Sequence, residues 1–329
     1  MRTCWVIDHP AHARLLAEVM RSGSTADLIV ATERPEVRSM LAHGDGRLPR
    51  RQTLWVQRPV GEGRYRKALH RLRSVQRFLK QAGRDGHGPV ERVVAVGASL
   101  ELMAAKPRWW RRSSAVERWY ISDTEVNHVA HRLALKSATD AVLPTHWKKD
   151  LDGGFLVAFS GRVHRLGGLH GHVHLSPLRR PSKVSSPPRI VVRRLKGGGV
   201  HDDDELVPLP EDALDGVVTT AVDENEVQGD PWRLDRELAT HDGVITQSVT
   251  LASEAVLLGT PTLLISRAER GFLDRLEMDG APLFRWRGPQ DEVAWESVHA
   301  QFLAGLHLTD ALEPLDWPDA RQQLKAWLG

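Results

Sequence analysis

Two histidines and an aspartate stand where a short apolar run ends near the start of the chain. Asp8, His9 and His12 follow the run 5–7, and Pro10 stiffens the turn between them. A histidine with a pKa of about 6.5 accepts a proton from a hydroxyl group, and a neighbouring carboxylate orients the ring. We therefore expect a general base here, His9 or His12, and favour His9 because it lies nearer the strand end. The alternative is that both histidines only shape a turn and a helix start.

A second pair of candidate groups, Asp123 and Glu125, follows the predicted strand 118–122. Side chains two residues apart point the same way when the chain stays extended. Two carboxylates on one side would bind hydroxyl groups or exchange protons as acid and base. The alternative is structural: Asp123 caps the next helix, and Glu125 lies in its first turn, where the helix dipole favours it.

The segment 243–265 reads as an apolar strand, a helix and a second apolar strand, with a polar turn after the first strand. A helix start exposes unpaired N–H groups and binds anions, and the Ser248 and Thr250 hydroxyls would add donors to a phosphate. Glu254 lies among apolar helix residues, and its carboxylate would accept two ribose hydroxyls. The alternatives are that Ser248 and Thr250 only cap the helix, and that Glu254 lies on an exposed face.

The predicted strand 189–195 ends in arginines, and glycine and acidic residues follow it. Arg193 and Arg194 suit the oxygens of a diphosphate, because the guanidinium group donates hydrogen bonds in a fork. The glycines 197–199 let the backbone approach a ligand closely, and His201 and Asp202 come next. A metal site is the weaker reading, since one loop supplies few of the converging ligands that an ion requires. A solvated basic patch is the other alternative.

Four histidines occur between residues 164 and 174. The alternation in the sequence Gly-His-Val-His-Leu, residues 171–175, predicts a strand with His172 and His174 on one face. No cysteine or carboxylate lies nearby in the sequence to complete a zinc site. We therefore expect this segment to be the edge of a domain and predict no bound metal.

Apolar runs and helical patterns alternate along both halves of the chain. Such alternation predicts an α/β protein with parallel sheets, here two doubly wound Rossmann-like domains facing across a cleft. The expected bounds are 1–180 for the first domain and 189–315 for the second. The segment 176–189, rich in proline, serine and arginine, is the expected linker. The tail 316–329 is expected to be a helix packed on the first domain.

The formal net charge of +3 hides two halves of opposite sign. Residues 1–188 contain 32 Lys and Arg against 16 Asp and Glu, whereas residues 189–329 contain 13 against 26. The helix predicted over 65–82 is very basic, with an apolar stripe of Leu69, Leu72, Val75, Phe78 and Leu79 that is expected to pack on the sheet. A basic half suits an anionic partner such as a phospholipid surface or a nucleic acid. The alternative is that the two halves attract each other.

The chain contains one cysteine, Cys4, which excludes an internal disulfide and suits a reducing compartment. No run approaches the roughly 20 apolar residues that a spanning helix requires. The expected location is therefore cytoplasmic, with contact to a membrane surface left open.

The pattern of Ser248, Glu254, Ala255, Leu258 and Gly259-Thr-Pro261 resembles the nucleotide-sugar motif of GT-B proteins. UDP-N-acetylglucosamine 2-epimerases and the transferases that form lipid II have similar runs. The resemblance implies that Glu254 binds a ribose and that the helix start faces a diphosphate. Epimerases have a Gly-Gly pair where this chain has Val249 and Thr250.

Three further segments narrow the resemblance. The segments 6–16, 122–145 and 191–202 are similar to a family of GT-B-like proteins called domain of unknown function 354. Together with 248–261 they occur in the same order along most of the chain. This resemblance implies the GT-B-like fold, whereas the reaction remains open because one fold hosts many functions.

The function expected from these patterns is a metal-independent glycosyltransferase that uses a nucleotide sugar, with UDP-sugar as the expected donor and no further cofactor. The second domain would bind the nucleotide, and the first would bind a lipid-linked or anionic acceptor. One alternative is an epimerase or hydrolase acting on the same donor, with Asp123 and Glu125 as acid and base. Another is a non-catalytic or nucleic-acid-binding protein, although the chain lacks the RRM, KH, zinc-finger and helix-turn-helix signatures.

Overall fold

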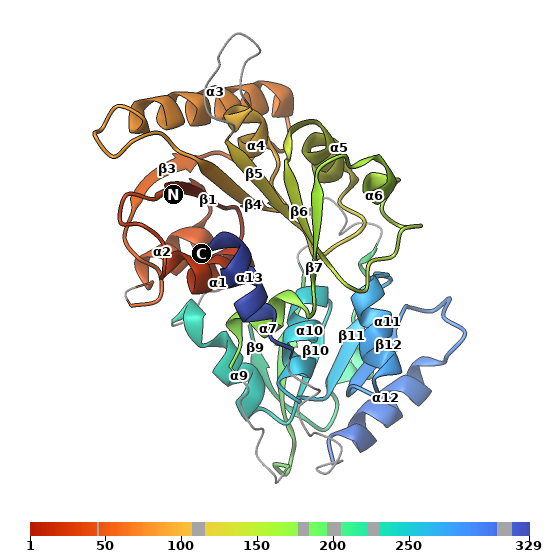
Figure 1. The fold of residues 1–329 in the computed structure, drawn as a ribbon. Helices are drawn as coiled ribbons and strands as arrows, with labels where there is room; N and C mark the ends of the chain where they lie inside the picture. Colours follow the sequence, from red (N-terminus) through yellow and green to blue (C-terminus); the bar gives the residue numbers. More distant parts are fainter. Residues whose placement is uncertain (45, 107–115, 177–183, 196–204, 223–229, 308–317) are drawn as a thin grey trace. The chain divides into compact units, whose positions relative to one another are not determined.

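The computed structural model describes residues 1–329 except 45, 107–115, 177–183, 196–204, 223–229 and 308–317. The chain divides into two compact units, each an α/β arrangement (Figure 1). Unit 1 comprises Met1–His174 together with Asp319–Gly329, and unit 2 comprises Leu175–Pro318.

Unit 1 is built on a sheet whose seven described strands are all parallel, in the order β3-β2-β1-β4-β5-β6-β7. The central strands β1 and β4 are buried at all five positions, as expected for parallel strands that have helices on both faces. The strands are β1 (Thr3–Ile7), β2 (Leu28–Thr32), β3 (Gln52–Val56), β4 (Arg92–Val96), β5 (Glu117–Ile121), β6 (Asp140–Pro144) and β7 (Arg162–Leu166).

The helices of unit 1 lie on both faces of this sheet. In Figure 1, α3, α4 and α5 cover one face, and α1, α2, α7 and α13 cover the other. The helices are α1 (Pro10–Met20), α2 (Pro35–Ala42), α3 (Arg64–Ala82), α4 (Leu100–Ala105), α5 (His128–Ser137), α6 (Phe155–Ala158), α7 (His170–His174) and α13 (Ala320–Leu328).

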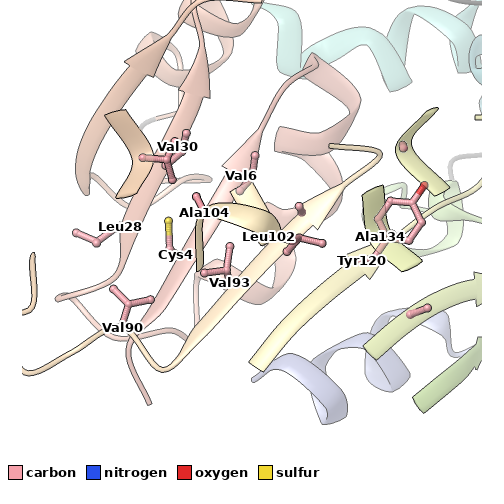
Figure 2. Close-up of a cluster of buried hydrophobic side chains, with 14 of the residues drawn as sticks. Cys4, Val6, Leu28, Val30, Val90, Val93, Leu102, Ala104, Tyr120 and Ala134 are labelled. Carbon is pink, nitrogen blue, oxygen red and sulfur yellow. The ribbon is translucent and has the colours of Figure 1, made fainter. Parts of the chain in front are cut away.

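One hydrophobic core of unit 1 lies between the sheet and the layer of α3, α4 and α5. Figure 2 shows Cys4, Val6, Leu28, Val30 and Val93 of three neighbouring strands among these buried side chains. The Cys4 thiol is fully buried, and burial raises its pKa, so Cys4 acts as a small apolar core residue.

The C-terminal helix α13 packs within unit 1 against α1, α7 and β7. Arg321 Nε donates to the carbonyl oxygen of Val173 at 2.7 Å, and Arg92 Nη1 donates to that of Leu328 at 2.6 Å. The first bond ties the end of the chain to α7 in the histidine-rich segment, and the second ties it to β4.

Unit 2 is built on a second sheet, whose five described strands are parallel and run in the order β12-β11-β10-β8-β9. Its core contains apolar residues of β8, β10 and β11 together with Trp286, Trp295 and Phe302. The strands are β8 (Arg189–Arg193), β9 (Val218–Ala221), β10 (Gly243–Thr246), β11 (Thr262–Ile265) and β12 (Leu283–Trp286).

Short helices connect these strands. Asp230 begins one of them, because its carboxylate accepts from the N–H of Trp232 and Pro231 occupies the first helical position. The helices of unit 2 are the 3₁₀ turns η1 (Glu211–Leu214) and η2 (Pro231–Arg233), with α9 (Leu234–Thr240), α10 (Val249–Leu257), α11 (Gly271–Met278) and α12 (Trp295–Gly305).

Each sheet has one place where the order of strands along the chain reverses. In unit 1 this switch point lies between β1 and β4, and in unit 2 it lies between β8 and β10. Ligands of doubly wound sheets bind beyond the carboxyl ends of the strands at such a point. Functional residues are therefore expected at these two positions.

Two local predictions from the sequence are wrong. Residues 170–174 form the helix α7 instead of a strand, so the alternation of histidines does not reflect a pleated chain. On α3, Leu69 is exposed, and the buried stripe includes Arg71 beside Val75 and Phe78.

Among the described residues, no helix is both long and apolar enough to cross a membrane.

Candidate functional site

The switch point of unit 1 is formed by the loops that follow β1 and β4. His9 caps α1, with its Nδ1 accepting from the N–H of Ala11 at 3.3 Å, so its side chain has a structural task at the helix start. His12 lies one turn later, with its ring centroid 5.8 Å from that of His9. A methyl group added at Gly97, just after β4, would lie 3.9 Å from Cε1 of His12. The His12 ring therefore lies at the point where β1 and β4 diverge.

Asp8 is held beside this ring by groups from two other elements. Thr32, at the end of β2, donates a hydrogen bond to Asp8, and Arg71 Nη2 of α3 lies 3.2 Å from Asp8 Oδ1. Burial alone would raise the pKa of Asp8, but Arg71, Thr32 and His12 outweigh it and lower the pKa to about 2. Asp8 is therefore ionised at neutral pH.

Sequence reasoning missed the buried ion pair behind Asp8. Arg71 Nε lies 2.5 Å from Glu101 Oε1 of α4, and the side chains are 4% and 1% exposed. The one guanidinium thus bridges two carboxylates, Glu101 and Asp8. The helical spacing of Arg71 with Val75, Phe78 and Ala82 could have placed Arg71 on the buried face of α3, but it gives no sign of the partner Glu101.

His12 is half-buried and uncharged at neutral pH. Burial lowers its pKa to about 4; Asp8 and Asp123 act in the opposite direction, and His170 and Arg34 add to the lowering. The Nδ1 atom of His12 is buried and has no hydrogen-bond partner among the described residues. A neutral imidazole at this position has a lone pair that can accept a proton.

The two carboxylates after β5 do not lie side by side. The chain bends at Asp123 and turns at Glu125, so the extended geometry expected from their spacing is not found. The Asp123 side chain is 40% exposed, whereas Glu125 is buried and its Oε1 accepts from the N–H of Lys148 at 3.0 Å. The structural alternative is wrong as well, because Asn127 caps α5 through the N–H of Ala130.

His170 lies beside Asp123, another contact that the sequence did not predict. Its Nδ1 is 3.4 Å from Asp123 Oδ2, and its side chain is 15% exposed. Burial lowers the pKa of His170, while Asp123 acts to raise it. Unit 1 thus brings Asp8, His12, Asp123 and His170 together at one edge of its sheet.

In unit 2, α10 begins at the switch point between β8 and β10. Ser248 is its N-cap and accepts from the N–H of Leu251 at 3.4 Å. Its expected contact with a phosphate stays a prediction. Thr250 is exposed in the first turn, and its carbonyl accepts from the Ser253 hydroxyl at 2.9 Å. The hydroxyl of Thr250 is therefore accessible near the helix start.

Glu254 is buried, with a relative exposure of 2%. The alternative that it lies on an exposed face is therefore wrong. Thr250 and Glu254 are four residues apart and share one face of α10. The helix rises about 1.5 Å per residue, so Glu254 lies about 9 Å along the axis from the Ser248 cap.

Gln247 joins the loops at this switch point and is a further residue that sequence reasoning missed. Its Oε1 accepts from the N–H of Leu195 at 2.9 Å, and its Nε2 donates to the carbonyl of Val207 at 2.6 Å. Arg193 Nη1 lies 3.4 Å from the carbonyl of Val222, and Arg194 is exposed. Gln247 therefore ties Leu195 and Val207 to the end of β10.

His201 and Asp202, expected to bind the nucleotide sugar, lie outside the described residues, so their prediction stays a prediction. Within the ranges that the structure describes, no three His, Cys, Asp or Glu side chains are placed to hold a metal ion.

The sequence matches no family model. No curated protein matches it either. Solved structures, however, match over almost the whole chain. A protein of Listeria monocytogenes described as a UDP-N-acetylglucosamine 2-epimerase is 12% identical, with a TM-score of 0.65 and coverage of 99% of this chain and 95% of that one.

Two further solved structures extend this likeness. UDP-GlcNAc 2-epimerase of Neisseria meningitidis bound to UDP-GlcNAc is 11% identical, with a TM-score of 0.61 and coverage of 100% of this chain and 99% of that one. Phytolacca americana UGT2, complexed with UDP-2-fluoro-glucose and pterostilbene, is 10% identical, with a TM-score of 0.52 and coverage of 100% and 94%. The predicted α/β class, with a doubly wound parallel sheet in each unit, is confirmed, and the fold is the one shared by 2-epimerases and GT-B glycosyltransferases.

Proposed function

We propose that this protein is a nucleotide-sugar-dependent glycosyltransferase of the GT-B class that requires no metal ion. Unit 2 binds the donor nucleotide, with UDP as the expected nucleotide, and unit 1 binds the acceptor and supplies the base. The proposal includes kinship with domain of unknown function 354, which rests on the four sequence segments named above. It also includes an anionic or lipid-linked acceptor near the exposed basic face of α3, which carries Arg64, Arg66, Lys67, Arg73 and Arg77.

The observation that carries the proposal is the buried Glu254 on a helix that starts at a switch point. The N–H groups at the start of α10 favour the diphosphate, and the Thr250 hydroxyl is exposed in the same turn. Glu254 lies two turns further along the axis, a separation that suits the ribose of the same nucleotide. A carboxylate accepts hydrogen bonds from both ribose hydroxyls, and it does so more strongly where water is excluded.

The chemistry assigned to unit 1 is removal of a proton from the acceptor. His12 is neutral at pH 7, because burial lowers its pKa to about 4, and its lone pair accepts the hydroxyl proton. The acceptor oxygen then forms a bond to the sugar carbon, while the bond from that carbon to the diphosphate breaks and its electron pair stays on the diphosphate oxygen. The ionised Asp8 stabilises the resulting imidazolium through its charge.

A second candidate, an epimerase or hydrolase acting on the same donor, is favoured by the structural comparison. The two 2-epimerase structures have TM-scores of 0.65 and 0.61, against 0.52 for the Phytolacca protein. Against it stands the position of Glu125, which is buried and bonded to the Lys148 backbone instead of lying beside Asp123. Asp123 alone would then have to supply the carboxylate chemistry.

A thermal-shift screen followed by product analysis tests the proposal. UDP, GDP, CMP and dTDP sugars are added to the full chain, and a ligand at about 100 times its dissociation constant adds about 2.7 kcal/mol to the free energy of unfolding. The proposal predicts that UDP sugars raise the melting temperature. Release of free sugar or of an epimer without any acceptor would favour the second candidate. If no nucleotide sugar raises the melting temperature, both candidates fail.

A further inference from the structure

Three polar side chains from separate elements of unit 1 meet at one edge of its sheet. His12 belongs to α1, His170 to α7, and Asp123 to the loop after β5, and α1 and α7 pack against each other. Asp123 Oδ2 lies 3.4 Å from His170 Nδ1, and the charges of both residues act on His12. Of the three, His170 has no task in the transfer chemistry described so far.

This cluster has hydrogen-bonding capacity that the described residues do not use. His12 Nδ1 and His170 Nε2 are both buried and have no hydrogen-bond partner among the described residues. Most buried polar atoms of native proteins have a partner, which is either protein, ordered water or a ligand. The Asp123 side chain, at 40% exposed, is accessible from solvent at the same place. The cluster therefore has the properties of a binding position.

The charges of the cluster select the class of ligand. Burial keeps both imidazoles neutral at pH 7. Asp8 is paired with Arg71, so the accessible carboxylate of Asp123 is the negative charge that faces a ligand here, and Arg34 opposes it. Such a site disfavours a phosphate group. A sugar hydroxyl fits better, because it donates to a carboxylate and also exchanges hydrogen bonds with a neutral ring nitrogen.

We propose that His12, Asp123 and His170 form a subsite for the hydroxyl groups of a neutral sugar unit in the acceptor. This inference rests on the proposed function, in which unit 1 binds the acceptor. Asp123 and His170 bind one hydroxyl, and the neighbouring hydroxyl is then presented to His12. The subsite thus narrows the class of possible acceptors from any anionic molecule to molecules that have a sugar at the reacting end.

Imidazole NMR on the full chain tests the subsite. The protein is labelled at the histidine Cε1 carbons, and the signals of His12 and His170 are assigned with His12→Gln and His170→Gln. Methyl glycosides of glucose and N-acetylglucosamine are titrated in parallel with inorganic phosphate. We expect at least one glycoside to shift both signals in a saturable, millimolar titration, whereas phosphate leaves them in place.

Two matched variants sharpen the test. Asp123→Asn should weaken glycoside binding at least tenfold, whereas Asp150→Asn, at an exposed position of unit 1, should leave it unchanged. Saturable shifts with phosphate alone, or no shift with any glycoside, would overturn the subsite. UDP binding is measured separately on the same samples. If UDP does not bind, the proposed function fails. If UDP binds but no glycoside shifts the histidine signals, only the subsite is rejected.

Discussion

The two switch points of this molecule have the same position in their sheets, but the side chains that surround them differ in charge. In unit 1 the half-buried Asp8 and His12 follow β1, and the buried Arg71–Glu101 pair lies behind them. In unit 2 the loops after β8 and β10 are joined by uncharged hydrogen bonds through Gln247. Charge at the first switch point suits proton transfer, and the neutral bonding at the second suits a fixed binding loop.

The buried Arg71 bridges two carboxylates behind the switch point of unit 1, and Arg71→Leu should remove this bridge. The substitution leaves Glu101 and Asp8 without their shared guanidinium, and breaking a buried ion pair in this way costs about 3–5 kcal/mol. Amide hydrogen exchange on the full chain measures the loss in peptides of unit 1. Arg73→Leu, at an exposed position of the same helix, is the control and should change little. Equal effects of the two substitutions would show that the pair contributes nothing particular.

The uncharged junction of unit 2 should be nearly as sensitive. Gln247→Leu leaves the N–H of Leu195 and the carbonyl of Val207 without their partner, and unsatisfied groups of this kind together cost about 3 kcal/mol. Hydrogen exchange should show the loss in unit 2, strongest at residues 193–195 and 205–207. Gln301→Leu, an exposed glutamine of α12, serves as the control. Unchanged protection in the Gln247 variant would mean that water replaces both bonds without cost.

Acid should destabilise unit 1 through its buried histidines, of which His131 is the clearest. Burial lowers its pKa to about 4, and its ring stacks on Phe155 at 4.7 Å. Below pH 6.5 the unfolded chain takes up a proton that the folded chain excludes, so stability falls from pH 6.5 down to about pH 4. At pH 5 the loss from this group is on the order of 2 kcal/mol.

Urea unfolding of wild type and His131→Phe at pH 7 and pH 5 measures this contribution. The phenyl ring cannot be protonated, so the variant should lose less stability between the two pH values than wild type does. His70→Gln, which replaces an exposed histidine of α3, should keep the wild-type pH dependence. The idea fails if wild type and His131→Phe respond identically to acid.

The features of both units that can be predicted from the sequence are those that depend on neighbouring residues. Apolar runs such as Cys4–Ile7 and 243–246 predict buried strands, and the apolar neighbours of Glu254 in α10 indicate burial. Ser248 is recognisable as a cap because a helical pattern follows it. These features depend on residues close together in the chain.

Features that depend on distant residues escape sequence reasoning. Arg71 resembles its many basic neighbours on α3, and only the position of α4 shows that it meets Glu101. His170 lies in a five-residue helix whose alternating histidines imitate a strand, and its contact with Asp123 joins segments 47 residues apart. Gln247 reads as the end of a strand, since nothing in the sequence places Val207 against it.

Calorimetric titration of the full chain with UDP tests the central claim, that unit 2 binds a nucleotide through Glu254. Wild type is compared with Glu254→Gln, which keeps the shape of the side chain, and with the exposed control Glu296→Gln. Loss of the charge from two hydrogen bonds to ribose should weaken UDP binding about tenfold to a hundredfold in Glu254→Gln, while Glu296→Gln binds like wild type. Equal UDP affinity in all three proteins, or none in wild type, would contradict the account.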